Sequence, residues 1–241
     1  MNLTFIFLGL FLSVITGGII VSYFKATNKS HFIKLALSFS GGFLLAIIFQ
    51  HLLPDLYNDE TQKIGVFILA GFLIQLVLEY FSGGIEHGHV HVHKDQVFPL
   101  VLFLALSVHS IIEGIPLGNE YTGIISDHSH AHGSIFWGIV FHQIPVSIAL
   151  MTLLINTKLS HFHSWLTLLA FSSMTPIGVL FGLFVSPDQI GLDVHIILAI
   201  VVGMFLHIST TIIFETSENH KFNFVKLISI LLGCGLAILM Y

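Results

Sequence analysis

His109 and Glu113 form a pair whose types and spacing could do chemistry. They lie four positions apart inside an apolar stretch at about 97–118, and residues with this spacing share one face of a helix. Ionisable groups at bilayer depth cost about 2.5–3.5 kcal/mol each on insertion scales and indicate a functional site. Imidazole and carboxylate groups suit zinc, iron or manganese, and Ser110 adds a hydroxyl beside them. The pattern therefore predicts part of a metal site.

A second polar group lies in the next apolar stretch, at about 134–155, where His142 and Gln143 offer an imidazole and an amide. With a rise of about 1.5 Å per residue, His142 falls at nearly the same depth as His109, and Glu113 falls about 6 Å farther out. Two imidazoles at one depth predict that both bind one ion. The alternative is a hydrogen bond between helices, a contact worth about 0.6 kcal/mol on average.

Prolines follow both groups in the sequence. Pro116 cannot donate to the carbonyl of Ile112, and Pro145 cannot donate to that of Phe141. Interrupted backbone at membrane depth is tolerated where it lines a cavity or is covered by protein, and discontinuous helices build the binding sites of many transporters. We therefore expect interrupted helices beside the polar residues.

Membrane helices must position these groups, because the composition excludes a water-exposed globule. Of 241 residues, 55% are hydrophobic and 9% charged, with a mean hydropathy of +0.94, whereas a soluble domain carries about 25% charged residues. The net charge of −5 excludes nucleic acid as a partner. The single cysteine, Cys234, excludes both a disulfide framework and a thiolate metal cage.

Eight apolar stretches are long enough to cross a hydrocarbon core, which takes roughly 20 residues. They predict an all-α membrane protein with one transmembrane domain over residues 1–241, embedded in a lipid bilayer. The first stretch has no basic region before it and is too long for a signal peptide, so we interpret it as a helix. The stretches fall at about 3–24, 35–56, 64–82, 97–118, 134–155, 164–186, 194–214 and 223–241.

The placement of lysines predicts the orientation. Seven of the eight lysines lie in or beside the linkers after the first, third, fifth and seventh stretches, and Lys63 is the exception. By the positive-inside tendency these linkers are cytoplasmic and both termini lie outside, in a multi-pass protein of the cell (inner) membrane. Acidic residues populate the outer linkers, and an acidic mouth concentrates cations.

Two linkers are rich in histidine: the cytoplasmic one at 83–96 and the outer one between the fourth and fifth stretches. Such tracts are typical of weak, exchangeable metal binding, and a merely polar loop is the alternative. We expect the cytoplasmic tract to modulate transport rather than to carry it. The histidines are His87, His89, His91 and His93 on the inner side and His128, His130 and His132 on the outer side.

Three further residues are candidates for a pathway to or from the site. His51 and Asp55 lie at the outer end of the second stretch, where they either guide entry or cap the helix end. His207, in the seventh stretch, falls about 6 Å to the inner side of His109. This position fits an exit step.

Five motifs, spread along the chain, resemble signatures of the ZIP family of divalent metal transporters. The most specific is His109-Ser110-x-x-Glu113-Gly114, in span four. The others are Gly41-Gly42-x-x-Leu45-Ala46, His51-x-x-Pro54-Asp55, His142-Gln143-x-Pro145 and Thr175-Pro176-Ile177-Gly178.

The resemblance implies a 3+2+3 arrangement, in which the first three and the last three spans form an inverted repeat around spans four and five. It also implies net transport of metal into the cytoplasm, with spans one, four, five and six moving against the rest. The metal ligands that it implies are His109, Ser110, Glu113, His142 and Gln143.

The chain departs from the family's two-metal pattern in span five. Members with two metals carry a second histidine and two glutamates where this sequence has Val146, Gln143 and Ser147. The lost ligands would remove much of the charge of a second site. We therefore expect one ion per cycle at a single site.

Together these features predict a transporter rather than an enzyme, with zinc as the substrate and iron, manganese or cadmium as alternatives. The sequence has no Walker motif, and an inside-negative potential of 100 mV supplies about 4.6 kcal/mol to a divalent cation moving inward. The expected partners are divalent metal ions and lipid. Whether the chain forms a homodimer stays open.

Two other classes of protein are alternatives. A cation diffusion facilitator, which would export metal, also has a histidine-rich loop, but it would need six spans and a soluble C-terminal domain. A bis-histidine haem protein for electron transfer could use His109 and His142 with His207 or His51. An intramembrane zinc protease is disfavoured because the sequence lacks an H-E-x-x-H motif.

Overall fold

The computed structural model describes residues 2–23, 29–58, 63–83, 98–122, 133–184, 193–215 and 224–240. Regular structure in these ranges is entirely helical, which confirms the all-α prediction. Both predicted histidine tracts, 87–93 and 128–132, lie outside the described residues. The helices are α1 (Leu3–Tyr23), α2 (Lys29–Ile47), the π-helical turn η1 (Ile48–Leu52), α3 (Leu53–Asn58), α4 (Ile64–Ser82), α5 (Leu100–Tyr121), α6 (Ser134–Ile155), α7 (His161–Ser172), α8 (Met174–Phe184), α9 (Val194–Glu215) and α10 (Phe224–Met240).

Seven helical segments within the described part of the chain are long and apolar enough to cross a membrane. The eighth predicted stretch is present as α10, an apolar helix of 17 residues. Its length is about 26 Å at 1.5 Å per residue, slightly less than a hydrocarbon core of about 30 Å. The seven longer segments are α1, Phe32–Tyr57 across α2, η1 and α3, then α4, α5, α6, His161–Phe184 across α7 and α8, and α9.

The interruptions predicted beside the metal site are wrong. Helices α5 and α6 run unbroken through Pro116 and Pro145. Each proline removes only one backbone donor, and membrane helices tolerate such a loss where they are covered by protein. Irregular backbone occurs instead at η1 and at Ser173, between α7 and α8. Helix α5 also starts later than predicted, after Pro99 at its N-cap, a place where a missing donor costs little.

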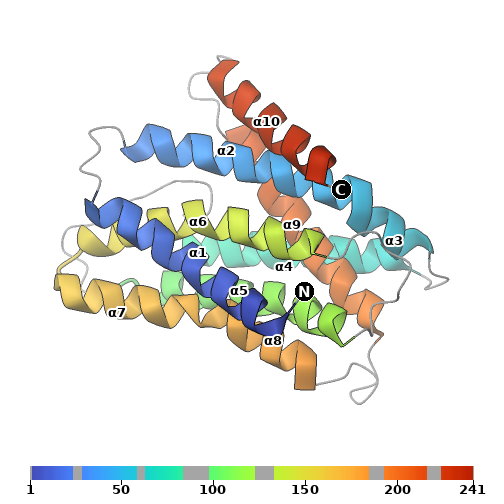
Figure 1. Cartoon of the computed structure of the whole chain (residues 1–241), viewed down its shortest axis with the longest axis horizontal. Helices are drawn as coiled ribbons and strands as arrows, with labels where there is room; N and C mark the ends of the chain where they lie inside the picture. The colour runs from blue at the N-terminus through green and yellow to red at the C-terminus, as the bar shows by residue number, and fades with distance from the viewer. Residues whose placement is uncertain are drawn as a thin grey trace.

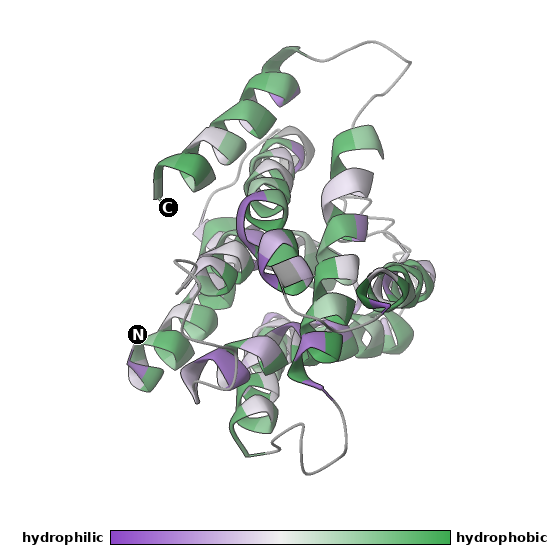
Figure 2. Ribbon diagram, turned by 90° about the vertical axis from the view of Figure 1, so that its right-hand side faces the viewer, coloured by the Kyte–Doolittle hydropathy of each residue, from purple (hydrophilic) through white to green (hydrophobic). Residues whose placement is uncertain are grey.

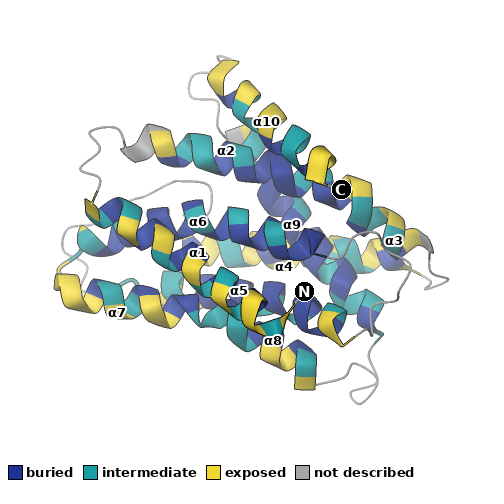
Figure 3. Cartoon of the chain, in the orientation of Figure 1, coloured by how far each residue is buried: buried dark blue, intermediate teal, exposed yellow. Residues whose placement is uncertain are grey.

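Helix α6 is the most enclosed of the seven spans, with 78% of its apolar window buried. Figure 3 shows this helix in the middle of the bundle with mostly buried residues. The most extensive packing joins four pairs of helices: α5 with α8, α2 with α10, α4 with α9, and α1 with α6. In Figure 1, α10 crosses above α2, while α5 and α8 lie together on the opposite side of the bundle.

Glycines bring α5 and α8 into backbone contact. A Cβ added to Gly178 would lie 2.0 Å from the carbonyl oxygen of Ile111, and one added to Gly114 would lie 2.3 Å from that of Thr175. One turn farther along, Gly118 and Gly182 make the same kind of approach. Such small-residue crossings are typical of helices packed within membranes, where the hydrophobic effect does not drive association. They fix α5, which carries His109 and Glu113, against α8.

The distribution of polarity is that of a membrane protein. Large hydrophobic side chains are exposed on most helices, for example Leu69 and Val77 on α4 and Leu232 on α10. The buried set, by contrast, includes His109 and Glu113. Figure 2 shows hydrophobic residues dominating the helices, with few polar ones among them. Apolar groups toward the outside and ionisable groups inside fit a lipid environment.

Candidate metal site

His109 and Glu113 of α5 and His142 of α6 converge at one point in the bundle. Each residue offers a ligand atom, and these atoms all lie within 4.8 Å of one another. The side chains are almost completely buried, with exposures of 2%, 1% and 1% respectively. Within the described ranges, this is the one group of three or more metal-ligating residues of these types. The structure thus brings together His109 and His142, predicted as the core ligands, with Glu113, predicted to adjust the charge of the site.

The geometry of the group leaves its coordinating atoms facing one another. The Nε2 atom of His109 lies 2.5 Å from Oε1 of Glu113, as expected for neighbours one helical turn apart. The rings of His109 and His142 are nearly perpendicular, with centroids 6.2 Å apart. Oε2 of Glu113 is buried and accepts no hydrogen bond from the described residues. A buried carboxylate is costly unless it is paired or binds a metal, so this arrangement suits a cation.

Gln143 is hydrogen-bonded to side chains of two other helices. Its Oε1 accepts a hydrogen bond from Oγ of Ser13 on α1, over 2.9 Å. Its Nε2 donates to Oγ1 of Thr175 on α8. Both ends of the amide are therefore engaged, and in this conformation Gln143 links three helices. Ser110, the other weak ligand predicted from the sequence, is buried beside His109 in α5.

Gln75 of α4 contacts His109 and was not among the residues predicted from the sequence. Its Oε1 lies 2.9 Å from Nδ1 of His109, on the side of the ring away from Glu113. Gln75 is completely buried, although only four of the 19 residues of α4 are buried. A signal was present in the sequence, because Gln75 and Glu79 are polar residues with helical spacing inside the apolar stretch 64–82.

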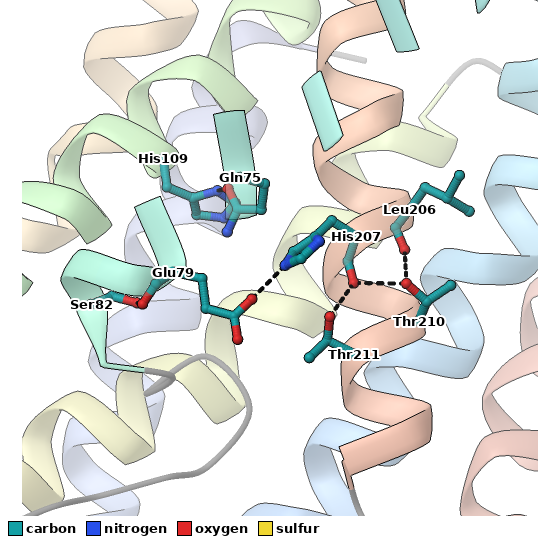
Figure 4. Close-up of polar contacts among 8 residues, drawn as sticks. All are labelled: Gln75, Glu79, Ser82, His109, Leu206, His207, Thr210 and Thr211. Carbon is teal, nitrogen blue, oxygen red and sulfur yellow. Dashed lines mark hydrogen bonds and ion pairs between the residues drawn. The ribbon is translucent and has the colours of Figure 1, made fainter. Parts of the chain in front are cut away.

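His207 of α9 lies apart from the three converging residues and pairs with Glu79 of α4. Its Nε2 contacts Oε2 of Glu79, and its ring packs edge-on against Phe72 with centroids 4.6 Å apart. Figure 4 shows Gln75 and Glu79 on successive turns of α4, the first beside His109 and the second beside His207. One polar face of α4 therefore reaches both histidines.

His51 and Asp55 are the candidate entry residues. They lie one turn apart near the C-terminal end of the segment formed by α2, η1 and α3. His51 is part of the π-helical turn η1, and Asp55 lies in the first turn of α3. Both side chains are partly exposed. Neither belongs to the converging group. Turns of π-helix are often found at functional sites.

The sequence matches the family model described as ZIP Zinc transporter over residues 84–241, which is more than half of the chain. The chain belongs to the ZIP zinc transporter family. The match includes α5 and α6 and therefore all three converging residues. Membership of the ZIP family confirms the resemblance predicted from the motifs, and it indicates a multi-pass membrane transporter rather than an enzyme.

Individual proteins of similar sequence include other ZIP transporters. Protein zntD of Dictyostelium discoideum is 28% identical over 174 aligned positions, in a match that covers 66% of this chain and 24% of zntD. Zinc transporter ZIP3 of Bos taurus is 24% identical over 247 residues, covering 75% of this chain and 77% of that protein. Zinc transporter ZIP1 of Danio rerio is 24% identical over 244 residues, with shares of 78% and 79%. The matched segment thus spans about a quarter of zntD but most of the other two proteins.

Proposed function

We propose that this ZIP family chain carries divalent metal ions, zinc foremost, into the cytoplasm through the site formed by His109, Glu113 and His142. The observation that carries the proposal is the convergence of these three buried side chains, with ligand atoms within 4.8 Å of one another. Two imidazoles and one carboxylate suit zinc, iron, manganese and, by similarity, cadmium. A site with few protein ligands keeps positions for water and so remains open to exchange.

The charge of the site fits transport better than permanent binding. Glu113 supplies one negative charge, which offsets half the charge of a divalent ion, and two neutral imidazoles add none. Ser110 and Gln143 would then adjust the coordination, Gln143 through Oε1 once this oxygen no longer accepts the hydrogen bond from Ser13. A resident structural metal would instead be expected to have a closed set of four ligands.

A single ion per cycle is consistent with the residues that replace the family's second set of ligands. Val146 is buried in an apolar cluster with Val14 and Leu168. The hydroxyl of Ser147 donates to the carbonyl oxygen of Ile144 in its own helix. Neither residue offers the imidazole or carboxylate that a second metal would need.

We infer eight spans in a 3+2+3 inverted repeat, with α10 as the eighth. An inverted repeat exchanges spans two and three with spans seven and eight, so the pair α2–α10 should correspond to the pair α4–α9. Both pairs pack extensively, and both cross at glycines. A Cβ added to Gly42 or to Gly233 would lie 2.3 or 2.1 Å from a carbonyl oxygen of the facing helix, and one added to Gly71 or to Gly203 would lie 1.9 Å from one.

The proposed route passes from an acidic outer surface to a cytoplasmic exit. His51 and Asp55 would receive ions near the outer end of the second span, and His207 with Glu79 would receive them after the central site. Seven of eight lysines lie in or beside linkers assigned to the cytoplasm, with both termini outside. The inside-negative potential then favours inward movement of a divalent cation.

Uptake of zinc into proteoliposomes tests this function. With the full chain reconstituted, we expect zinc entry that rises when an inside-negative potential is imposed. His109→Ala and His142→Ala should abolish that entry while leaving the protein folded. Near-normal flux in either variant would exclude the proposed site, and competition among zinc, iron, manganese and cadmium would rank the substrates. A sharp Soret band in the purified protein would favour the haem alternative instead.

A further inference from the structure

Gln75 lies beside Nδ1 of His109, where its side chain can determine which ring nitrogen carries the hydrogen. Helix α4 has four buried residues, Ile64, Gly71, Gln75 and Ser82, and Gln75 has an exposure of 0%. Its Oε1 lies 2.9 Å from Nδ1 of His109. A buried amide on a predominantly apolar helix is expensive unless it is hydrogen-bonded. Its position is therefore explained by its contact with the histidine.

We propose that Gln75 is a positioning residue that fixes the tautomer of His109, so that Nε2 is the atom that binds the transported metal. This proposal rests on the proposed function. An amide oxygen only accepts hydrogen bonds, and a neutral imidazole carries its hydrogen on one nitrogen. Acceptance by Gln75 Oε1 keeps the hydrogen on Nδ1, and the lone pair then lies on Nε2. That nitrogen lies 2.5 Å from Oε1 of Glu113, inside the converging group. Without an ion so short a contact requires a proton shared between the two atoms, and the metal ion takes the place of that proton when it binds.

The chemistry of the amide explains why a glutamine fits this position. Histidines that bind metals usually donate their other N–H to a carboxylate, a carbonyl or water, which fixes the ring and raises its basicity. A glutamine gives the required acceptor without adding a negative charge. Glu113 then stays the one carboxylate among the converging residues. A second carboxylate would hold a divalent ion more tightly and slow its release.

Two substitutions separate this role from simple packing. Gln75→Met keeps the size and flexibility of the side chain but removes the acceptor, so the apparent KM for zinc uptake should rise about 10- to 100-fold, the usual effect of losing such a partner. Gln75→Glu keeps an acceptor, so its KM should be no higher than that of the wild type, while its maximal rate should fall. Gln50→Met is the matched control, because Gln50 is exposed, and its KM should match the wild type.

A measurement on the wild-type protein tests the tautomer without any variant at Gln75. Nitrogen-15 NMR of histidine-labelled, zinc-loaded protein should show His109 with a protonated Nδ1 and a metal-bound Nε2, the His109 signals being assigned by their loss in His109→Ala. Coordination through Nδ1 would overturn the proposal, even if Gln75→Met failed to fold.

The uptake assay has its own contradicting outcomes. An unchanged KM in Gln75→Met, or an equal loss in Gln75→Met and Gln75→Glu, would also overturn the role of Gln75. Absence of zinc uptake by the wild-type protein would instead refute the proposed function itself. The two failures are therefore distinguishable.

Discussion

Ser13 of α1 donates a hydrogen bond over 2.9 Å to the amide oxygen of Gln143 on α6. The same amide donates to Thr175 of α8, so one side chain joins three helices close to the proposed site. In the sequence this residue is a candidate metal ligand. In the structure its hydrogen-bonding groups are directed to neighbouring helices.

Removal of the Ser13 hydroxyl tests the strength of this link. Ser13→Ala should lower the free energy of unfolding by about 0.6 kcal/mol, and by no more than about 1.7 kcal/mol, the average and the largest value measured for hydrogen bonds between membrane helices. Unfolding is followed by circular dichroism in detergent. Ser38→Ala is the matched control, because the Ser38 hydroxyl donates to the carbonyl oxygen of Lys34 in its own helix. Equal losses in the two variants would show that the contact with Gln143 contributes nothing to stability.

The crossing of α5 and α8 should tolerate no added side chain. Gly178→Ala places a Cβ 2.0 Å from the carbonyl oxygen of Ile111, so the helices must separate, and overpacking of this kind costs about 1–3 kcal/mol. We expect a lower thermal midpoint and reduced zinc uptake. Gly235→Ala is the control, since its added Cβ would have no atom of another described helix within 4 Å, and it should be as stable as the wild type or slightly more stable. A Gly178→Ala protein with wild-type stability would contradict the close approach of the two backbones.

The two carboxylates near the histidines should affect different kinetic parameters. Glu113→Gln removes the negative charge from the converging group, so the apparent KM for zinc should rise roughly tenfold or more, equivalent to at least about 1.4 kcal/mol of binding. Glu79→Gln alters the pair with His207, outside that group, so the maximal rate should fall with a smaller change in KM. Initial rates of zinc uptake over a range of concentrations measure both. A higher KM for Glu79→Gln than for Glu113→Gln would reverse the proposed order of sites.

The cytoplasmic histidine tract is predicted to be dispensable for transport. Deletion of residues 87–93 removes four imidazoles that would bind metal only weakly, and we expect substantial zinc uptake by the shortened protein in proteoliposomes. His109→Ala serves as the inactive reference. A deletion variant as inactive as that reference would mean that the tract is part of the pathway itself.

Much of the fold and of the site was predictable because it depends on residues that are close together in the sequence. Apolar stretches gave the positions of the helices, and the four-residue spacing of His109 and Glu113 placed them on one face of α5. The common depth of His109 and His142 correctly predicted that they meet. These inferences need only the regular rise and period of a helix.

Tertiary packing decided what the order of residues leaves open. Proline chemistry predicted broken helices at Pro116 and Pro145, but the surrounding bundle keeps both helices continuous. Gln75 contacts His109, which lies 34 positions away in the sequence. Glu79 contacts His207, which lies 128 positions away. A sequence defines the turn on which a side chain lies. Which neighbouring helix it faces depends on how the helices rotate and how closely glycines let them approach, and that is a property of the whole bundle.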